Sequence, residues 1–340
     1  MKNIEYNRRK FIKGASGLVA GLGLGSVAIA GYKKEVIEKR VSGLSKIEIP
    51  ENPLVLFDNF HNGNRRSYSW KAKFASAERA GFDGFELVRV LPGSDNWKEA
   101  IDLMPETKFK IWGMHWSSKS VLDNEVKNIE ADIEGVYELA EACAKTSIEY
   151  ITMSLSGNGE LRGNTIHGSG SAKAEERHWQ RAYKIMKAFD QACKKNNIRG
   201  SLYPHTHWIC DTPQSVEKIL NGAGAQTLGP AFCSHHWFAN KNSDELDDVF
   251  KSEIMKRLNY VVLTNGKFVD ADFLAVRFDE GVIDMAWVLA KLIEFGYKGQ
   301  ISSQGYGIGG DPYTSGKLFV DTVKALKERF RLYPYLWPLN

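Results

Sequence analysis

The sequence predicts an α/β protein in which eight strands alternate with helices and close into a single (β/α)8 barrel. From residue 53 onward, eight short apolar runs alternate with longer amphipathic segments. The segment that carries them, about 290 residues long, matches the size of such a barrel. No Gly-x-Gly-x-x-Gly motif follows the first run, which disfavours a doubly wound sheet that binds dinucleotides. The barrel domain is therefore expected over residues 53–340.

The predicted strands are runs of about four to six residues bounded by Gly, Pro or polar residues, a pattern typical of strands buried on both faces. They span Leu54–Phe57, Gly84–Val88, Lys108–Trp112, Tyr150–Met153, Arg199–Tyr203, Gly229–Cys233, Tyr260–Thr264 and Gln300–Ser303. Helical periodicity between the strands predicts a second set of elements. These helices include Ala131–Lys145, Lys173–Lys195, Ser243–Leu258 and Ile283–Phe295.

The first 30 residues are predicted to be a twin-arginine export signal. Arg8 and Arg9 precede an apolar residue and a weakly apolar stretch rich in Gly and Ala, and a small-x-small site ends at Ala30. The stretch falls short of the roughly 20 strongly apolar residues of a membrane-spanning helix. We therefore expect cleavage after Ala30, a periplasmic location and no stable membrane anchor after cleavage. Residues 31–52, rich in Lys, Glu and Ser, are expected to form a linker.

The charge of the chain lies in this predicted signal. The formal net charge is +4, and the first 30 residues hold five bases and one acid. The predicted barrel is therefore neutral overall. A nucleic-acid binder needs a basic surplus on its folded part, because phosphate neutralisation supplies much of its affinity. We expect no nucleic-acid partner.

The four cysteines are widely spaced, with no Cys-x-x-Cys motif. The periplasm permits disulfides, but spacing alone does not pair these residues. Cys143 and Cys193 lie in helical patterns and are predicted to be buried apolar side chains.

Polar residues at the ends of the predicted strands indicate an active site, because chemistry in such barrels takes place at the C-terminal ends of the strands. Six of the eight histidines follow predicted strands. Pleating sends neighbouring residues to opposite faces, so one residue each of the pairs His205/His207 and His236/His235 is expected to point into the barrel mouth. Glu86 lies inside an apolar strand, where a carboxylate is costly unless it is paired or functional.

These positions give two groups of candidates. Glu86 has the alternative of a structural anchor that forms hydrogen bonds inside the barrel. Aromatic side chains near strand ends would suit the apolar faces of a sugar ring. The candidate catalytic residues are Glu86, His115 and His205. The candidate substrate contacts are Trp116, His207, Trp237, Asn265 and Tyr306.

Four motifs in order along the chain carry a resemblance to a known family. They are AGFDGFEL at Ala80–Leu87, TPQSV at Thr212–Val216, GVID at Gly281–Asp284 and GYKG at Gly296–Gly299. With them the chain resembles the sugar phosphate isomerase/epimerase family, whose members fold as xylose isomerase-like TIM barrels. The segment from Gln304 to Pro312 and the motif Tyr203-Pro204-His205 resemble an exported branch of that family.

The resemblance implies a metal site that this sequence changes. The family pattern has a Glu on strand five, an Asp three residues before a His on strand six, a His on strand seven and a Glu on strand eight. The corresponding positions here are Tyr203–His205, Cys233, Thr264–Asn265 and Gln304, and His236 alone is retained. We expect His205, His236 and Gln304 to bind a divalent ion such as Zn²⁺, Co²⁺, Ni²⁺ or Mn²⁺, since imidazole suits the softer of these. The alternative is acid–base chemistry by the histidines without a metal.

The family reaction moves a proton next to a carbonyl through an enediolate. The resemblance therefore implies a sugar isomerase or epimerase, with Glu86 or His115 as the base. The predicted export and the lack of a phosphate-binding loop favour an unphosphorylated sugar or glycoside. Two alternatives stay open: a 3-keto-glycoside lyase that works by β-elimination, and a periplasmic sugar-binding protein without catalysis. The oligomeric state is left open.

Overall fold

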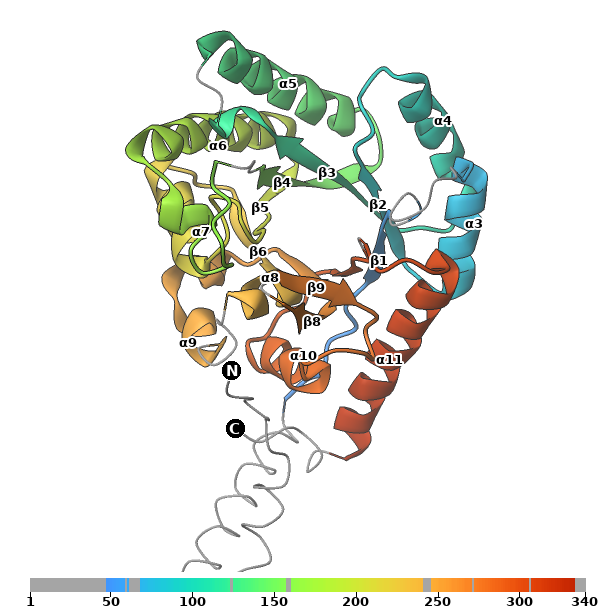
Figure 1. The fold of residues 1–340 in the computed structure, drawn as a ribbon. Helices are drawn as coiled ribbons and strands as arrows, with labels where there is room; N and C mark the ends of the chain where they lie inside the picture. The colour runs from blue at the N-terminus through green and yellow to red at the C-terminus, as the bar shows by residue number, and fades with distance from the viewer. Residues whose placement is uncertain are drawn as a thin grey trace, which may run out of the picture.

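Eight parallel strands close into a barrel in the order β1-β10-β7-β6-β5-β4-β3-β2, which confirms the predicted fold (Figure 1). We describe a computed structural model that covers residues 47–58, 60, 68–122, 125–156, 160–240, 246–270, 272–305 and 307–333. The barrel strands are β1 Leu54–Phe57, β2 Gly84–Val88, β3 Ile111–Ser118, β4 Ile148–Leu155, β5 Arg199–Leu202, β6 Gly229–Cys233, β7 Tyr260–Leu263 and β10 Ile301–Ser303.

Strand β3 differs most from its prediction, because it starts at Ile111 and continues to Ser118. The predicted strand ended at Trp112, where the apolar run stops. The strand continues because its later residues stay paired with β4, up to Ser118 opposite Leu155. Polar side chains in this part face each other, and the Ser117 and Ser154 hydroxyls lie 2.7 Å apart. His115 therefore lies within the strand.

Helices pack around the outside of the barrel, with the first described one, α3, next to the last, α11 (Figure 1). They are α3 Trp70–Ala80, α4 Asp95–Leu103, α5 Val126–Ala144, α6 Glu176–Asn196, α7 Pro213–Gly222, α8 Ser234–Ala239, α9 Leu246–Lys251, α10 Met285–Glu294 and α11 Pro312–Leu332. The helix predicted over 243–258 is interrupted in its described part. Ser252 has extended backbone angles and separates α9 from the 3₁₀ turn Glu253–Arg257.

A hairpin that the sequence did not predict follows β7. Strands β8 Asn265–Val269 and β9 Asp272–Val276 pair antiparallel and stand apart from the barrel sheet. Phe268 and Phe273 face each other across the pair, with ring centroids 4.7 Å apart. The hairpin places its side chains on the rim of the barrel rather than in its wall.

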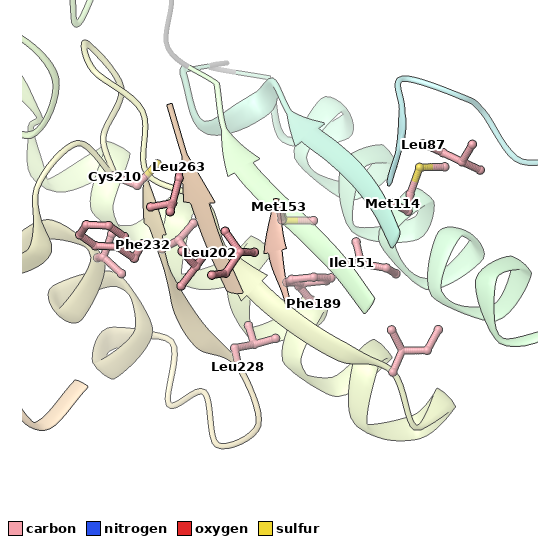
Figure 2. Close-up of a cluster of buried hydrophobic side chains, with 14 of the residues drawn as sticks. Leu87, Met114, Ile151, Met153, Phe189, Leu202, Cys210, Leu228, Phe232 and Leu263 are labelled. Carbon is pink, nitrogen blue, oxygen red and sulfur yellow. The ribbon is translucent and has the colours of Figure 1, made fainter. Parts of the chain in front are cut away.

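The core has two parts. The larger lies between the barrel and the helices, and Figure 2 shows residues of it such as Met153, Leu202 and Phe232 from the strands and Phe189 from α6. The smaller part lies inside the barrel and includes three tyrosines. Its members are Tyr150, Tyr203, Ala231, Cys233, Tyr260 and Val262. All four cysteines are buried free thiols, which confirms the burial predicted for Cys143 and Cys193.

The described end of the predicted linker packs on the amino end of the barrel. The side-chain amide of Asn52 donates to the carbonyl oxygens of Tyr297 at 3.1 Å and Gly299 at 2.7 Å. The Lys327 ammonium donates to Pro50 O at 2.9 Å. Residues 47–52 therefore belong to the barrel, and the predicted signal and the rest of the linker lie outside the described residues. Within the described part of the chain, none of the helices is long and apolar enough to cross a membrane.

Candidate active site

Glu86 lies inside the barrel, fully buried, where four hydroxyl groups face its carboxylate. Thr152 Oγ1 donates to Glu86 Oε1 at 2.7 Å. The Tyr260 hydroxyl donates to Oε2, and Tyr150 and Ser302 contribute longer contacts of 3.4 and 3.5 Å to the same oxygen. Burial raises the pKa of Glu86 to about 7, although the hydrogen bonds act to lower it. The carboxyl group therefore changes its protonation state near neutral pH.

A glycine makes room for one of these hydroxyls. Gly113 of β3 lies between Glu86 and Tyr150 in the strand register. A Cβ atom at Gly113 would lie 2.1 Å from the Tyr150 ring. Because real Cβ contacts are never that short, only glycine lets the Tyr150 ring cross β3 toward Glu86.

His115 is joined to Glu86 through Thr152. His115 Nδ1 lies 2.9 Å from Thr152 Oγ1, whose proton is already donated to Glu86. His115 Nδ1 therefore donates, and Nε2 carries the lone pair, 3.4 Å from the Ser154 hydroxyl. Burial lowers the pKa of His115 to about 3, and the positive charge of Arg89 lowers it further. The ring is a neutral base with an oriented acceptor nitrogen.

Two further histidines lie together after β5 and β6, with ring centroids 4.1 Å apart. His205 Nδ1 donates to Thr206 O at 2.7 Å, which leaves the lone pair on Nε2. His236 is in the other tautomer, because the Thr206 backbone N–H donates to its Nδ1 at 3.3 Å. His236 Nε2 therefore carries a proton. Burial lowers the pKa of both rings, that of His205 to about 4, so both are neutral.

The tyrosine ring between these groups connects the two parts of the wall. The Tyr203 ring makes edge contacts with the His115 ring at 5.2 Å and with the His236 ring at 5.9 Å. Two buried polar atoms of the described residues have no hydrogen-bond partner here, His236 Nε2 and Gln304 Oε1. One donor and one acceptor are thus left for a bound molecule or ion.

A family model described as xylose isomerase-like TIM barrel matches residues 74–327. The chain belongs to this family. No curated protein matches the sequence.

Solved structures share the fold of this xylose isomerase-like TIM barrel at low sequence identity. A 3-keto-D-glucoside 4-epimerase from E. coli is 14% identical, with a TM-score of 0.63, over 82% of this chain and 100% of that one. An L-ribulose 3-epimerase is 12% identical, with a TM-score of 0.67, over 85% and 99%. An IOLI protein with a bound zinc atom is 14% identical, with a TM-score of 0.61, over 84% and 99%.

The described residues of this xylose isomerase-like barrel fit a divalent metal ion. Of the three predicted ligands, Gln304 offers an unpartnered Oε1 and His205 offers its Nε2 lone pair, whereas His236 Nε2 would first have to lose its proton. The described residues also contain a group that the sequence did not predict. Ligand atoms of Cys233, His235 and His236 lie within 4.8 Å of one another.

Two predicted aromatic contacts lie away from the barrel mouth. Trp116 follows His115 in β3 and therefore points out of the barrel, and its ring lies 4.0 Å from a Cβ built on Gly135 of α5. Trp237 is buried against Phe232 in the outer core, with ring centroids 5.1 Å apart. Both predictions assumed that a strand-end position faces the site, and pleating and a helical turn send these side chains outward.

Asn265, a predicted substrate contact, forms hydrogen bonds with backbone groups instead. Its amide donates to the carbonyl oxygens of Phe278 and Ile283, and its Oδ1 accepts from the backbone N–H groups of Gly266 and Ile283. These four bonds at 2.8 to 3.2 Å use the whole side chain to hold the segment after the hairpin. Asn265 thus holds the framework, and substrate contact is not supported.

His207 lies on the rim. Its Nε2 is 3.5 Å from Asp272 Oδ1, and Asp272 also pairs with Arg162 at 3.1 Å. The loops after β4 and β5 and the β8–β9 hairpin therefore meet at this residue. Tyr306 lies outside the described residues.

Sequence reasoning missed the hydroxyls of Thr152 and Tyr260, since single Thr and Tyr residues in an apolar strand carry no signal. It also missed the pair of Asp58 and Lys73, in which Lys73 Nζ lies 2.8 Å from Asp58 Oδ2 and both side chains are largely buried. Asp58, a carboxylate directly after β1, was the feature of the sequence that could have indicated this pair.

Two hollows on the surface lie outside this cluster. One of about 450 Å³ is bounded by the hairpin and by the glycines after β10, on the same end of the barrel as the histidines. A larger one of about 560 Å³ lies at the amino end, beside Pro53, Ile111 and Lys327. Catalysis in this fold takes place at the carboxyl ends of the barrel strands. We therefore place the candidate site at the buried cluster and not at the larger hollow.

Proposed function

We propose that the chain is an exported enzyme that isomerises or epimerises an unphosphorylated sugar by moving a proton next to a carbonyl group. The observation that carries the proposal is the hydrogen-bonded chain Glu86–Thr152–His115, whose terminal base lies across the Tyr203 ring from the unpartnered N–H of His236. Enolisation needs both parts, a base for the carbon-bound proton and a donor for the oxygen that becomes negative.

Each group has a defined part in the proposed reaction. His115 Nε2 takes the proton from carbon. The positive charge of the ring is then balanced by Glu86 through the Thr152 hydroxyl, which keeps His115 Nδ1 protonated. His236 Nε2–H donates to the carbonyl oxygen and stabilises the enediolate.

His205 supplies a second base. Its Nε2 lone pair is set by the bond from Nδ1 to Thr206 O, and its ring stacks on Trp208 at 3.8 Å. A second base that reaches the other face of a planar enediolate would return the proton there, as epimerisation requires. When His205, His236 and Gln304 hold a divalent ion instead, their free atoms serve as ligands, the ion would polarise the carbonyl oxygen and His115 stays the base.

Two observations support a neutral sugar as the substrate. The described groups that meet at the site are uncharged imidazoles and an amide, and the nearby Lys73 ammonium is paired with Asp58. Uncharged imidazoles and an amide suit the hydroxyl groups of a neutral sugar better than the charge of a phosphate. Two of the structurally similar proteins are sugar epimerases, and one of these acts on a keto-glucoside.

The test is proton exchange. The full chain is incubated in D₂O with a panel of ketoses and 3-keto-glycosides, and NMR follows deuterium at the carbon next to the carbonyl. We expect exchange with at least one neutral sugar, and its loss in His115→Ala. His167→Ala, a change on an exposed loop, is the matched control and should keep the wild-type rate.

The same spectra separate the alternatives. Loss of the glycosidic group with formation of an unsaturated ketone would identify the lyase. Sugar binding without exchange for any member of the panel would identify a binding protein and overturn the proposed enzyme.

A further inference from the structure

We propose that the rim hollow, the space of about 450 Å³ between the β8–β9 hairpin and the loop after β10, binds the apolar aglycone (the non-sugar group) of a glycoside substrate. The inference rests on the proposed function, because it places the sugar ring at the buried cluster and the aglycone in the rim hollow. It narrows the substrate from a neutral sugar to a glycoside with an aryl or alkyl group.

The β8–β9 hairpin turns one face toward the rim hollow because its other face packs on the barrel beside α8 (Figure 1). Phe273 of β9 lies against Phe238 of α8, with ring centroids 5.9 Å apart, and both rings pack on the main core. Successive side chains of a strand alternate between its two faces. Leu274 and Val276 therefore lie on the face opposite Phe273, and both line the rim hollow.

Apolar side chains from both walls line the rim hollow. Leu274 is 48% exposed, although it is a large aliphatic residue, and Val276 lies next to it on the same face. Ile308, from the loop after β10, contributes from the other wall and is partly exposed. A bound apolar group would remove part of this surface from water, which favours binding.

The wall formed by the loop after β10 is built largely from backbone. Gly307, Gly309 and Gly310 line it, with φ angles of 76°, 74° and 72°. These angles lie in the left-handed region that favours glycine. A Cβ atom built on any of the three meets nothing within 4 Å, so the space in front of this wall is open.

The charges around the rim hollow suit an uncharged group. Two bases and two acids line it, so its formal charge is zero. The Arg277 guanidinium pairs with Asp279 at 3.1 Å and with Glu280 at 3.3 Å. Asp311 caps α11, where it accepts from the backbone N–H and the hydroxyl of Thr314. An uncharged aglycone leaves these interactions intact.

The rim hollow is connected to the buried cluster through Gln304. Val276 pairs with Asn265 across the hairpin, and Asn265 follows Thr264, whose hydroxyl donates to Gln304 O at 2.7 Å. Along the chain, Gln304 precedes Gly307 by three residues, a span of at most about 11 Å. Gln304 Oε1 is a buried acceptor without a partner, so a sugar hydroxyl can donate to it. A sugar ring held there would have its aglycone within reach of the rim hollow.

Equilibrium binding tests the inference. Isothermal titration calorimetry of the full chain compares methyl and phenyl 3-keto-D-glucosides, each as both anomers, which share the sugar and differ in the aglycone. We expect the phenyl glucoside of one anomer to bind at least about 10-fold more tightly than its methyl counterpart. Such a gain corresponds to about 55 Å² of apolar surface removed from water.

Two variants of exposed hairpin residues locate the aglycone. Leu274→Ser should lose most of the preference for the phenyl glucoside, because it removes apolar surface from the rim hollow. Val269→Ser is the matched control: Val269 is 40% exposed on the same face of the hairpin, at its end, and does not line the rim hollow. It should keep the wild-type preference. An equal loss in the two variants would place the aglycone elsewhere and overturn the inference.

The wild type alone can also overturn the inference. Equal affinities of the methyl and phenyl glucosides would do so, and so would the absence of binding by either. The deuterium-exchange experiment is scored separately. Exchange without a phenyl preference would remove the aglycone site and leave the proposed function. A phenyl preference that depends on Leu274, without exchange for any sugar, would leave the aglycone site and overturn the proposed enzyme.

Discussion

The Thr152 hydroxyl donates to Glu86 Oε1 at 2.7 Å, so the oxygen of that hydroxyl is left as an acceptor. His115 Nδ1, 2.9 Å away, fills that position. A hydroxyl has one proton, and its use toward Glu86 fixes the direction of the whole chain. Glu86, through the Thr152 hydroxyl, therefore determines that Nε2 of His115 carries the lone pair and acts as the base of the proposed reaction.

Thr152→Val should slow deuterium exchange by about 10- to 100-fold, because the isosteric change removes the link that balances the charge on His115. The substrate KM should change little, since Thr152 lies behind His115. Thr152→Ser restores the hydroxyl and should recover most of the rate. NMR exchange with the best substrate of the panel measures all three proteins.

A uniform loss in both Thr152 variants would contradict the relay and indicate a packing role. Ser154→Ala offers a matched control, because Ser154 contacts Nε2 of the same ring at 3.4 Å and lies outside the chain to Glu86. Removal of the Ser154 hydroxyl should slow deuterium exchange less than removal of the Thr152 hydroxyl.

Glu86→Gln should change how stability depends on pH. The pKa of Glu86 is raised from 4.5 to about 7 in the folded protein by burial, so between these values the folded state holds a proton that the unfolded state has released. The contribution of Glu86 to stability is therefore fully present below pH 4.5 and is lost as pH rises to about 7. Over the whole titration the free energy of unfolding falls by about 3 kcal/mol from this group.

Urea unfolding of both full-length proteins at pH 5 and pH 8 measures this effect. The wild type should lose about 2.5 kcal/mol more than Glu86→Gln over that range, because part of the loss has already occurred at pH 5. The contributions of histidines such as His115 are common to both proteins and cancel in the comparison. Parallel pH profiles would show that Glu86 does not titrate between these pH values.

The sequence predicted the barrel because strands buried on both faces leave continuous apolar runs, and β1, β2 and β6 match their predicted bounds. It predicted Glu86 because a carboxylate in such a run is conspicuous. The polar partners were not predictable, since Thr152 and Tyr260 come from distant strands and meet Glu86 only when the barrel closes.

The direction of side chains near the strand ends was the second feature that the sequence did not predict. An apolar run does not show where a strand ends, and β3 continues six residues past its predicted end to Ser118. The prediction therefore treated Trp116 as a residue at the mouth, although it points to α5. Likewise, the tautomers of His205 and His236 depend on Thr206, whose position no local pattern specifies.

Gly113→Ala should destabilise the fold by about 1–3 kcal/mol or more, because the new methyl group overlaps the Tyr150 ring and the interior has no room for it. The built Cβ lies 2.1 Å from that ring. Gly135→Ala is the control, as its Cβ meets nothing closer than 4.0 Å and alanine favours the α5 helix. It should be neutral or stabilising in thermal unfolding, and equal effects of the two changes would contradict the packing argument.

Replacement of Arg8 and Arg9 by lysine should stop export of the chain, if the first 30 residues are the twin-arginine signal that we propose. The export pathway recognises the arginine pair itself, so lysine keeps the charge but is not recognised.

Fractionation of bacteria that produce each form, followed by mass measurement of the periplasmic protein, gives the result. The wild type should be recovered in the periplasm without residues 1–30, and the double variant should stay in the cytoplasm at full length. A Lys10→Arg, Lys13→Arg variant keeps the pair, alters neighbouring bases and should be exported normally. Equal periplasmic amounts of all three proteins would show that the pair does not direct export.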